Sequence, residues 1–195
     1  MTAEERVRMH FENTIATQAR AREALSAGVA EAARRLAATL EAGGRILVCG
    51  NGGSASDAQH FAAEFTNRFE RERPPLAAIA LTTDTSALTA IGNDYSFDQV
   101  FSKQVEALAR PGDAVVGITT SGGSRNVCAA VEAAHEADAW VLALTGRSGG
   151  AIAKLLGDND LELRVPAERT AHIQEVHIVL LHCLCDLVDE KLYPQ

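Results

Sequence analysis

The sequence has little of several features that mark particular classes of protein. Positive charge is scarce, because 18 Lys and Arg face 26 Asp and Glu and leave a formal net charge of −8. No basic cluster offsets this locally, and an acidic chain is repelled by the phosphate backbone of nucleic acids. No run reaches the roughly 18 consecutive apolar residues that cross a bilayer. We therefore expect neither a nucleic-acid partner nor a membrane span.

Cysteine is also scarce, and an apolar leader is missing. The four cysteines form no CxxC pair and no zinc-finger spacing, so we expect reduced, packed thiols at Cys49, Cys128, Cys183 and Cys185. The first ten residues, MTAEERVRMH, are charged where a signal peptide is apolar. These two features predict a cytoplasmic protein.

What the sequence does contain is enough apolar residues for one core. A length of 195 residues with 47% apolar composition fits a single domain over residues 1–195. Residues 1–42, rich in Ala, Glu and Arg at helical spacing, predict an N-terminal helical arm of two helices hinged near Gly28. Residues 43–195 predict the rest of the domain. They end in one long helix, because the stretch 170–191 contains neither Gly nor Pro.

Five short apolar runs lie within that second part, separated by segments long enough for helices. They occupy residues 45–50, 76–81, 114–119, 140–145 and 161–165. This rhythm predicts an α/β fold, a three-layer αβα sandwich of flavodoxin-like type with a five-stranded parallel sheet. All but the last run end in, or are directly followed by, Gly, Ser, Thr or Asp, and such sheets bind ligands at their carboxyl edge. The charged stretch RFERERPP, 68–75, predicts a solvated helix end closed by prolines.

Two glycine-serine loops follow predicted strands and precede predicted helices. GNGGS, 50–54, lets a backbone approach a ligand beside a helix start, but no Lys follows as in a Walker loop. TTSGGS, 119–124, adds four hydroxyls around two glycines. Helix capping explains one hydroxyl per loop. Because the second loop is richer than a cap requires, we expect these loops to bind a phosphate group.

Two pairs of side chains at helical spacing carry the possible chemistry. His60 and Glu64 are four residues apart, so both can reach one ion or one proton. Gln174 and His182 are eight apart and share one broad helix face. Spacing alone does not decide between His177 and His182 as the functional histidine.

Four separated motifs, taken in order, resemble the sugar isomerase (SIS) domain family over nearly the whole chain. They are GNGGSASDAQHFAAEF, 50–65; LTTDTSALTAIGNDYSF, 81–97; TTSGGS, 119–124; and RTAHIQEVHIVLLH, 169–182. The likeness is to members that isomerise a phosphorylated heptose. It implies ketose–aldose isomerisation of sedoheptulose 7-phosphate to D-glycero-D-manno-heptose 7-phosphate through an enediol, which supplies a precursor of lipopolysaccharide heptose.

The resemblance also implies the site and the assembly. It implies one Zn²⁺ per subunit with ligands at His60, Glu64, Gln174 and His182, and an acid/base pair of Glu64 and His182 in a homotetramer. The implied substrate contacts are Asn51, Gly52, Gly53, Glu64, Asn93, Asp94, Thr119, Thr120, Ser121, Ser124 and Gln174. From the sequence alone, Asp94 is nearly as well explained as a turn residue beside Gly92 and Asn93.

Two alternatives to an enzyme stay open. The stretches RFERERP, 68–74, and HCLCDLVDEKLYP, 182–194, also resemble a non-catalytic member of the family that binds the bacterial replication initiator. That protein lacks the carboxylate at the place of Glu64 and the imidazole at the place of His182, and both are present here. The third possibility is a module that senses a sugar phosphate without converting it.

Overall fold

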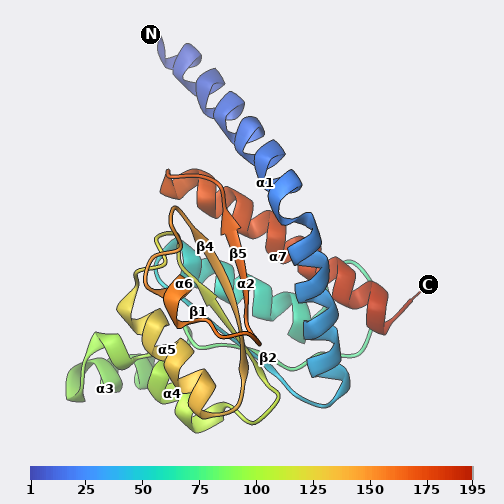
Figure 1. Ribbon diagram of the computed structural model, residues 1–195, viewed down its shortest axis with the longest axis vertical. Coiled ribbons are helices and arrows are strands. Elements are labelled where there is room, and N and C mark those ends of the chain that lie inside the picture. Colours follow the sequence, from blue (N-terminus) through green and yellow to red (C-terminus); the bar gives the residue numbers. More distant parts are fainter. Residues whose placement is uncertain (195) are drawn as a thin grey trace.

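The chain forms a five-stranded sheet between two layers of helices, as the computed structural model shows for residues 1–194 (Figure 1). The strands are β1 (Ile46–Gly50), β2 (Ala78–Ala80), β3 (Ala114–Ile118), β4 (Trp140–Gly146) and β5 (Leu161–Val165). All neighbours are parallel, in the order β2-β1-β3-β4-β5. The predicted three-layer α/β fold with a five-stranded parallel sheet is confirmed, and this strand order is the flavodoxin-like one.

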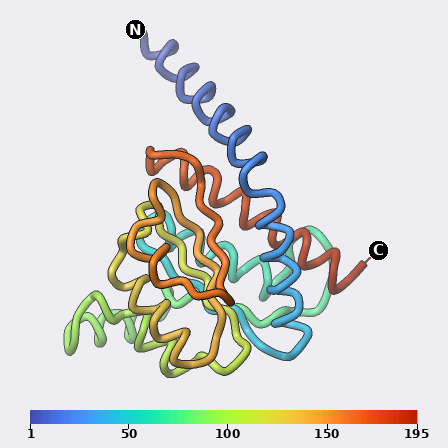
Figure 2. Tube along the Cα trace, in the orientation of Figure 1, coloured from blue at the N-terminus to red at the C-terminus, as the bar shows by residue number. Residues whose placement is uncertain are grey.

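Helices cover both faces of the sheet, as the trace in Figure 2 also shows. One face carries α1 (Ala3–Glu41), α2 (Gly53–Thr66) and α7 (Thr170–Leu192). The other carries α4 (Ser102–Leu108), α5 (Arg125–Glu136) and α6 (Ile152–Leu155), with α3 (Thr85–Asp94) and the short 3₁₀ helix η1 (Phe97–Gln99) beside them. Because both faces are covered, β1, β3 and β4 are buried along their whole length.

The N-terminal arm is one helix, so the predicted hinge near Gly28 is wrong. α1 runs for 39 residues without a break. A Cβ at Gly28 would lie 2.9 Å from Cδ2 of Leu163 on β5, so the glycine permits close packing of the helix on the sheet rather than a bend. The first buried residue of α1 is Thr17, and the turns before it extend away from the domain (Figure 1).

The C-terminal helix has the predicted extent and lies across the domain. α7 has the length and the average apolar composition of a membrane-crossing helix, although it contains no unbroken apolar run of that length. Half of its most apolar stretch is nevertheless buried inside the molecule, where α7 packs against α1 and α2. This is the pattern of a core helix.

The charged stretch after α2 differs from its prediction. α2 ends at Thr66, and the following residues are not helical. Arg68, Glu70 and Glu72 are exposed as expected, but the side chain of Arg73 is only 1% exposed. The prediction of a solvated helix end is therefore wrong at Arg73, whose charge is balanced by a distant residue that sequence reasoning did not identify.

The cysteines, all within the described residues, are unpaired, as predicted. Cys49 and Cys185 are buried, and burial raises the pKa of Cys49 to about 12. Cys128 is half-buried, while Cys183 is exposed on α7 rather than packed in the core. Burial of part of each side chain raises the pKa of these two thiols as well, so neutral thiols are expected.

Candidate active site

A cleft of about 340 Å³ opens at the carboxyl edge of the sheet, where the two glycine-serine loops lie side by side. Its lining consists of Asn51, Gly52, Gly53, Ser54, Ile118, Thr119, Thr120, Ser121, Ser124, Thr170 and Gln174. The loops follow β1 and β3, between which the strand order changes direction. The cleft therefore lies where open α/β sheets bind their ligands, and it brings together eight of the eleven predicted substrate contacts.

Three helices begin at this cleft without a side-chain cap. The residues that precede α2, α5 and α7 are Gly52, Ser124 and Arg169, and none makes a side-chain capping hydrogen bond. Each helix start leaves backbone N–H groups unpaired and carries the positive end of the helix dipole. The lining contains no Lys or Arg, so these helix starts supply the attraction for an anion.

The second loop keeps its hydroxyls on the cleft side. Oγ1 of Thr119 and Oγ of Ser124 lie 3.0 Å apart, and Ser121 Oγ accepts a hydrogen bond of 3.1 Å from the N–H of Gly123. Gly122 has φ +66°, and a Cβ there would lie 1.9 Å from the carbonyl oxygen of Gly149. The loop is thus held by a backbone contact that only glycine permits.

A reciprocal pair of amides joins the two loops. Asn51 Nδ2 donates to Oδ1 of Asn126, and Asn126 Nδ2 donates to Oδ1 of Asn51, each at 2.8 Å. Asn126 lies in the first turn of α5 and is 3% exposed. Two amides that satisfy each other's hydrogen bonds in this way fix a geometry. This pair holds the start of α2 against the start of α5.

The residues with acid/base chemistry follow along α2 and α7. His60 Nε2 donates to Oε1 of Glu64 at 2.8 Å, and the rings of His60 and His182 meet edge to face with centroids 5.2 Å apart. Gly53 and Gln174 meet nearer the cleft, because a Cβ on Gly53 would lie 2.5 Å from Nε2 of Gln174. The two helices therefore run side by side in the same direction, with matching residues at successive levels.

The structure separates His177 from His182. His182 is half-buried beside His60, whereas His177 is fully buried and donates from Nε2 to the carbonyl of Thr145 at 2.9 Å. Burial lowers the pKa of His177 to about 4, against a partial opposing effect of that hydrogen bond. The two histidines that spacing left open thus differ in position: His182 faces α2, and His177 faces the sheet.

Asn93 and Asp94 are placed away from the cleft. Both are exposed in the last turn of α3, where Asn93 Nδ2 donates to Oδ1 of Asp94 at 2.8 Å. α3 packs mainly against η1 and buries none of its residues (Figure 1). These two predicted substrate contacts, like Glu64, are absent from the lining of the cleft.

Sequence reasoning missed four residues around the site. Ser54 and Thr170 line the cleft, and Asn126 holds the loops together. Asp57 lies one turn from both Gly53 and His60 on the same face of α2. One of its carboxylate oxygens is buried without a partner in the described residues, and burial raises its pKa. A helical wheel centred on His60 and Glu64 would have indicated Asp57, and the GNGGS loop contains Ser54, whereas Thr170 and Asn126 depend on tertiary contacts.

The proposed zinc ligands have suitable chemistry, because imidazole and carboxylate are common ligands and an amide oxygen is an unusual one. As they stand, His60 and Glu64 bond to each other, and Gln174 lies against Gly53, seven residues or about 10 Å of helix from His60. Within residues 1–194, no three His, Cys, Asp or Glu side chains are arranged to hold a metal. The donor types fit zinc, and the side chains are grouped without forming a closed metal site.

The SIS domain profile matches residues 10–146. This chain belongs to the SIS domain family. A phosphoheptose isomerase of Neisseria gonorrhoeae is 60% identical over 98% of this chain and 97% of its own length.

Solved structures agree with this SIS domain over almost its full length. The phosphoheptose isomerase structure from Neisseria gonorrhoeae has a TM-score of 0.93 and 57% identity, and covers 97% of this chain and 100% of that one. The structure from Francisella tularensis has a TM-score of 0.95 at 48% identity with the same coverage. The likeness therefore includes α7, which lies beyond the matched profile.

His177 makes the stability of this SIS domain depend on pH. Because its pKa is about 4 when folded and 6.5 is its ordinary value, the unfolded chain binds the proton first as the pH falls. The neutral His177 ring makes its full contribution to the free energy of unfolding above about pH 6.5. This contribution is lost as the pH falls towards 4, which lowers the free energy of unfolding by about 3 kcal/mol in total. The free energy of unfolding, measured with urea across this pH range, should change less steeply with pH for His177→Gln than for the wild type. Identical slopes would contradict the assignment.

The two serines of the second loop should contribute strongly to binding. Ser121→Ala with Ser124→Ala removes two hydroxyl donors near an anion, each worth about 1.5–3 kcal/mol. We expect the dissociation constant for sedoheptulose 7-phosphate, measured by calorimetry, to rise on the order of 10²-fold or more. Thr89→Ala, which removes a hydroxyl bonded within α3, is the control. Unchanged binding by the double variant would reduce the loop to a structural turn.

Proposed function

We propose that this SIS domain is a phosphoheptose isomerase that converts sedoheptulose 7-phosphate to D-glycero-D-manno-heptose 7-phosphate. The observation that carries the proposal is the grouping of Glu64 and His182 around His60, next to an anion-binding cleft. Full-length relatives at about 60% identity bear that activity in their names, which supports the same assignment. The product is a precursor of lipopolysaccharide heptose.

The phosphate group of the substrate binds in the cleft. A dianion of about −1.5 to −2 charge is matched there by three helix starts and by the hydroxyls of the second loop. His60 lies seven residues beyond Gly53 on α2, about 10 Å along the helix axis. An extended seven-carbon chain with a terminal phosphate spans a comparable length, so its carbonyl end reaches the level of His60 and Glu64.

The reaction needs a proton moved between two neighbouring carbons while two oxygens exchange protons. Glu64 takes the proton from one carbon and returns it to the next, through an enediol. His182 holds and moves the protons at the oxygens. Groups placed in this way contribute roughly 10²–10⁴-fold to the rate. Asn51, Thr119 and Thr120 fix the orientation of the substrate from the cleft.

Zinc is part of the proposal. His60, Glu64 and His182, with Gln174 as the fourth ligand that the family resemblance implies, would hold one ion per subunit. When bound, zinc would polarise the oxygens at the carbonyl end of the sugar. Because the amide of Gln174 is a weak ligand, we expect modest affinity for the metal.

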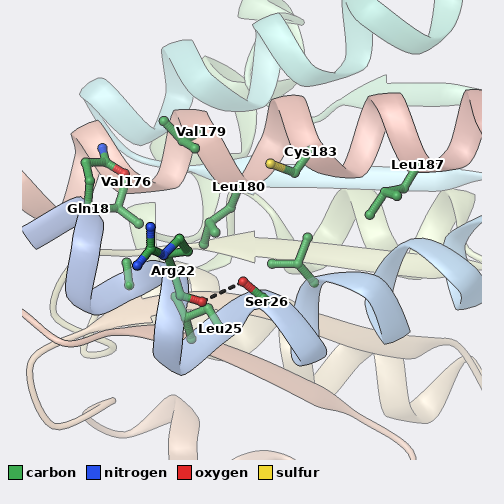
Figure 3. Close-up of a pocket in the computed structure, with 11 residues that line it drawn as sticks. Gln18, Arg22, Leu25, Ser26, Val176, Val179, Leu180, Cys183 and Leu187 are labelled. Atoms are coloured by element: carbon green, nitrogen blue, oxygen red, sulfur yellow. Dashed lines mark hydrogen bonds between the residues drawn. The ribbon is translucent and has the colours of Figure 1, made fainter.

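The assembly proposed is a homotetramer. An apolar groove of about 290 Å³ runs between α1 and α7, walled by Leu25, Val179, Leu180 and Leu187 among others (Figure 3). Towards the N-terminus of α1, where the helix extends from the domain, the exposed apolar side chains include Val7, Phe11 and Ile15, at 54%, 67% and 67% exposure. Exposed apolar side chains together with an apolar groove favour self-association. Four unpaired thiols in the described residues support a location in the cytoplasm.

The catalytic assignment predicts the effect of two substitutions. Glu64→Gln keeps the size of the side chain but removes the base, and His182→Asn removes the imidazole. Turnover of sedoheptulose 7-phosphate, followed by NMR of the aldose product, should fall by roughly 10²–10⁴-fold in each variant. Both variants should still bind the sugar phosphate, because the cleft does not include either side chain.

Glu70→Gln is the matched control, since Glu70 is an exposed carboxylate on the segment after α2. It should keep wild-type turnover. Wild-type protein that is inactive with zinc present, or a Glu64→Gln variant as active as wild type, would overturn the enzyme assignment. That result would favour the non-catalytic protein that binds the replication initiator.

The tetramer can be tested by light scattering at micromolar concentration. We expect a mass of four chains for the wild type. Phe11→Glu with Ile15→Glu should lower the mass, because two charges replace exposed apolar side chains of α1. A monomeric wild type with full activity would contradict the proposed assembly.

A further inference from the structure

Arg73 is a buried charge outside the site, and its contacts lead to both catalytic helices. It lies in the non-helical segment between α2 and β2, and its side chain is 1% exposed. Its Nε donates to Oδ1 of Asp189 at 2.8 Å, and Asp189 is likewise 1% exposed on α7. The rest of the guanidinium faces the end of α2.

At the end of α2 the guanidinium donates hydrogen bonds to backbone carbonyls that have no partner within the helix. Nη2 of Arg73 donates to the carbonyl of Glu64 at 2.8 Å, and Nη1 donates to the carbonyl of Phe65 at 2.7 Å. The last four carbonyls of a helix have no partner within it, and they form the negative end of its dipole. The last turn of α2 contains no basic residue of its own. Arg73 therefore caps α2 from a different segment.

The same side chain thus joins the backbone of Glu64 to α7. Asp189 lies seven residues, or two helical turns, beyond His182. Cys185 lies between His182 and Asp189 on α7. Burial is the largest cause of the raised pKa of its thiol, and the negative charges of Glu64 and Asp189 raise that pKa further. The Arg73–Asp189 pair therefore links the end of α2 that carries Glu64 to the part of α7 that lies two turns beyond His182.

Stability alone does not account for this pair. Two charges removed from water cost several kcal/mol each, and apolar residues of similar volume often replace such a pair without loss. Here Oδ2 of Asp189 is also buried without a partner in the described residues. An apolar pair cannot donate hydrogen bonds, whereas the planar guanidinium binds two carbonyls of α2 and a carboxylate of α7 at once.

We propose that Arg73 is a positioning residue that, together with Asp189, sets the register of α2 against α7 and thereby the separation of Glu64 and His182. The inference rests on the proposed function, because these two residues are its acid/base pair. It adds a group that touches no substrate and acts through the backbone of Glu64. A displacement of about 1 Å at reacting groups can cost about 10²-fold in rate.

The test replaces the ion pair by apolar side chains, Arg73→Met with Asp189→Leu. We expect a folded protein by circular dichroism, kcat lower by at least about 10-fold and KM changed by less than about threefold, because the phosphate cleft is untouched. The matched control is Arg71→Met with Glu190→Leu. That neighbouring pair joins the same two segments but holds no carbonyl of α2. Its kcat should stay at the wild-type value.

A second measurement does not depend on turnover. The ¹H–¹³C NMR signal of the His182 Cε1–H group, assigned with His182→Asn, should shift in the Arg73 double variant and stay in place in the Arg71 control. A folded Arg73 double variant with wild-type kcat, or with an unmoved His182 signal, would overturn the inference.

If the double variant does not fold, Arg73→Lys takes its place. Lysine keeps the charge opposite Asp189 but lacks the planar fork that reaches both carbonyls. The same fall in kcat and the same NMR shift are expected, and wild-type values of either would refute the role. If wild-type protein does not convert sedoheptulose 7-phosphate, the proposed function fails, while the NMR comparison still decides whether Arg73 sets the register.

Discussion

β1 and β3 pair in parallel over five residues, from Ile46 opposite Ala114 to Gly50 opposite Ile118, and the site depends on this pairing. Because the two strands end at the same level, the loops that follow begin together and their helices start side by side. The amides of Asn51 and Asn126 then fix the junction. Every other feature of the cleft, including the uncapped helix starts and the hydroxyls of the second loop, is built on two strands that are not consecutive in the chain.

The second requirement is that α2 and α7 keep a fixed register along their length. Near the cleft the missing side chain of Gly53 makes room for the amide of Gln174, and further on His60 meets His182. Arg73 and Asp189 close the far end. The two helices therefore lie parallel to each other, and their relative position is fixed by contacts at three places along their length. In the proposed function, the phosphate group binds at the start of the two helices and proton transfer takes place at their middle.

Local patterns predicted most of the fold and the parts of the site that lie within one element. The apolar runs located all five strands to within two residues, and the spacing of His60 and Glu64 placed them together. Gly28 was misread because its reason is a contact with Leu163, far along the chain. Arg73 was misread because its partner, Asp189, is 116 residues away. The same limit applies to Thr170 and Asn126, whose roles arise only when separate elements meet.

The short outer strand limits how chains can join. β2 has three residues and forms one edge of the sheet, and the preceding Pro74 and Pro75 have no backbone N–H to offer. Another strand arriving at this edge would find few hydrogen-bonding groups, which suppresses edge-to-edge aggregation. The strand at the opposite edge, β5, packs against α1 through one of its faces. Two copies of the chain are thus less able to associate by pairing their edge strands than by packing their helices against each other.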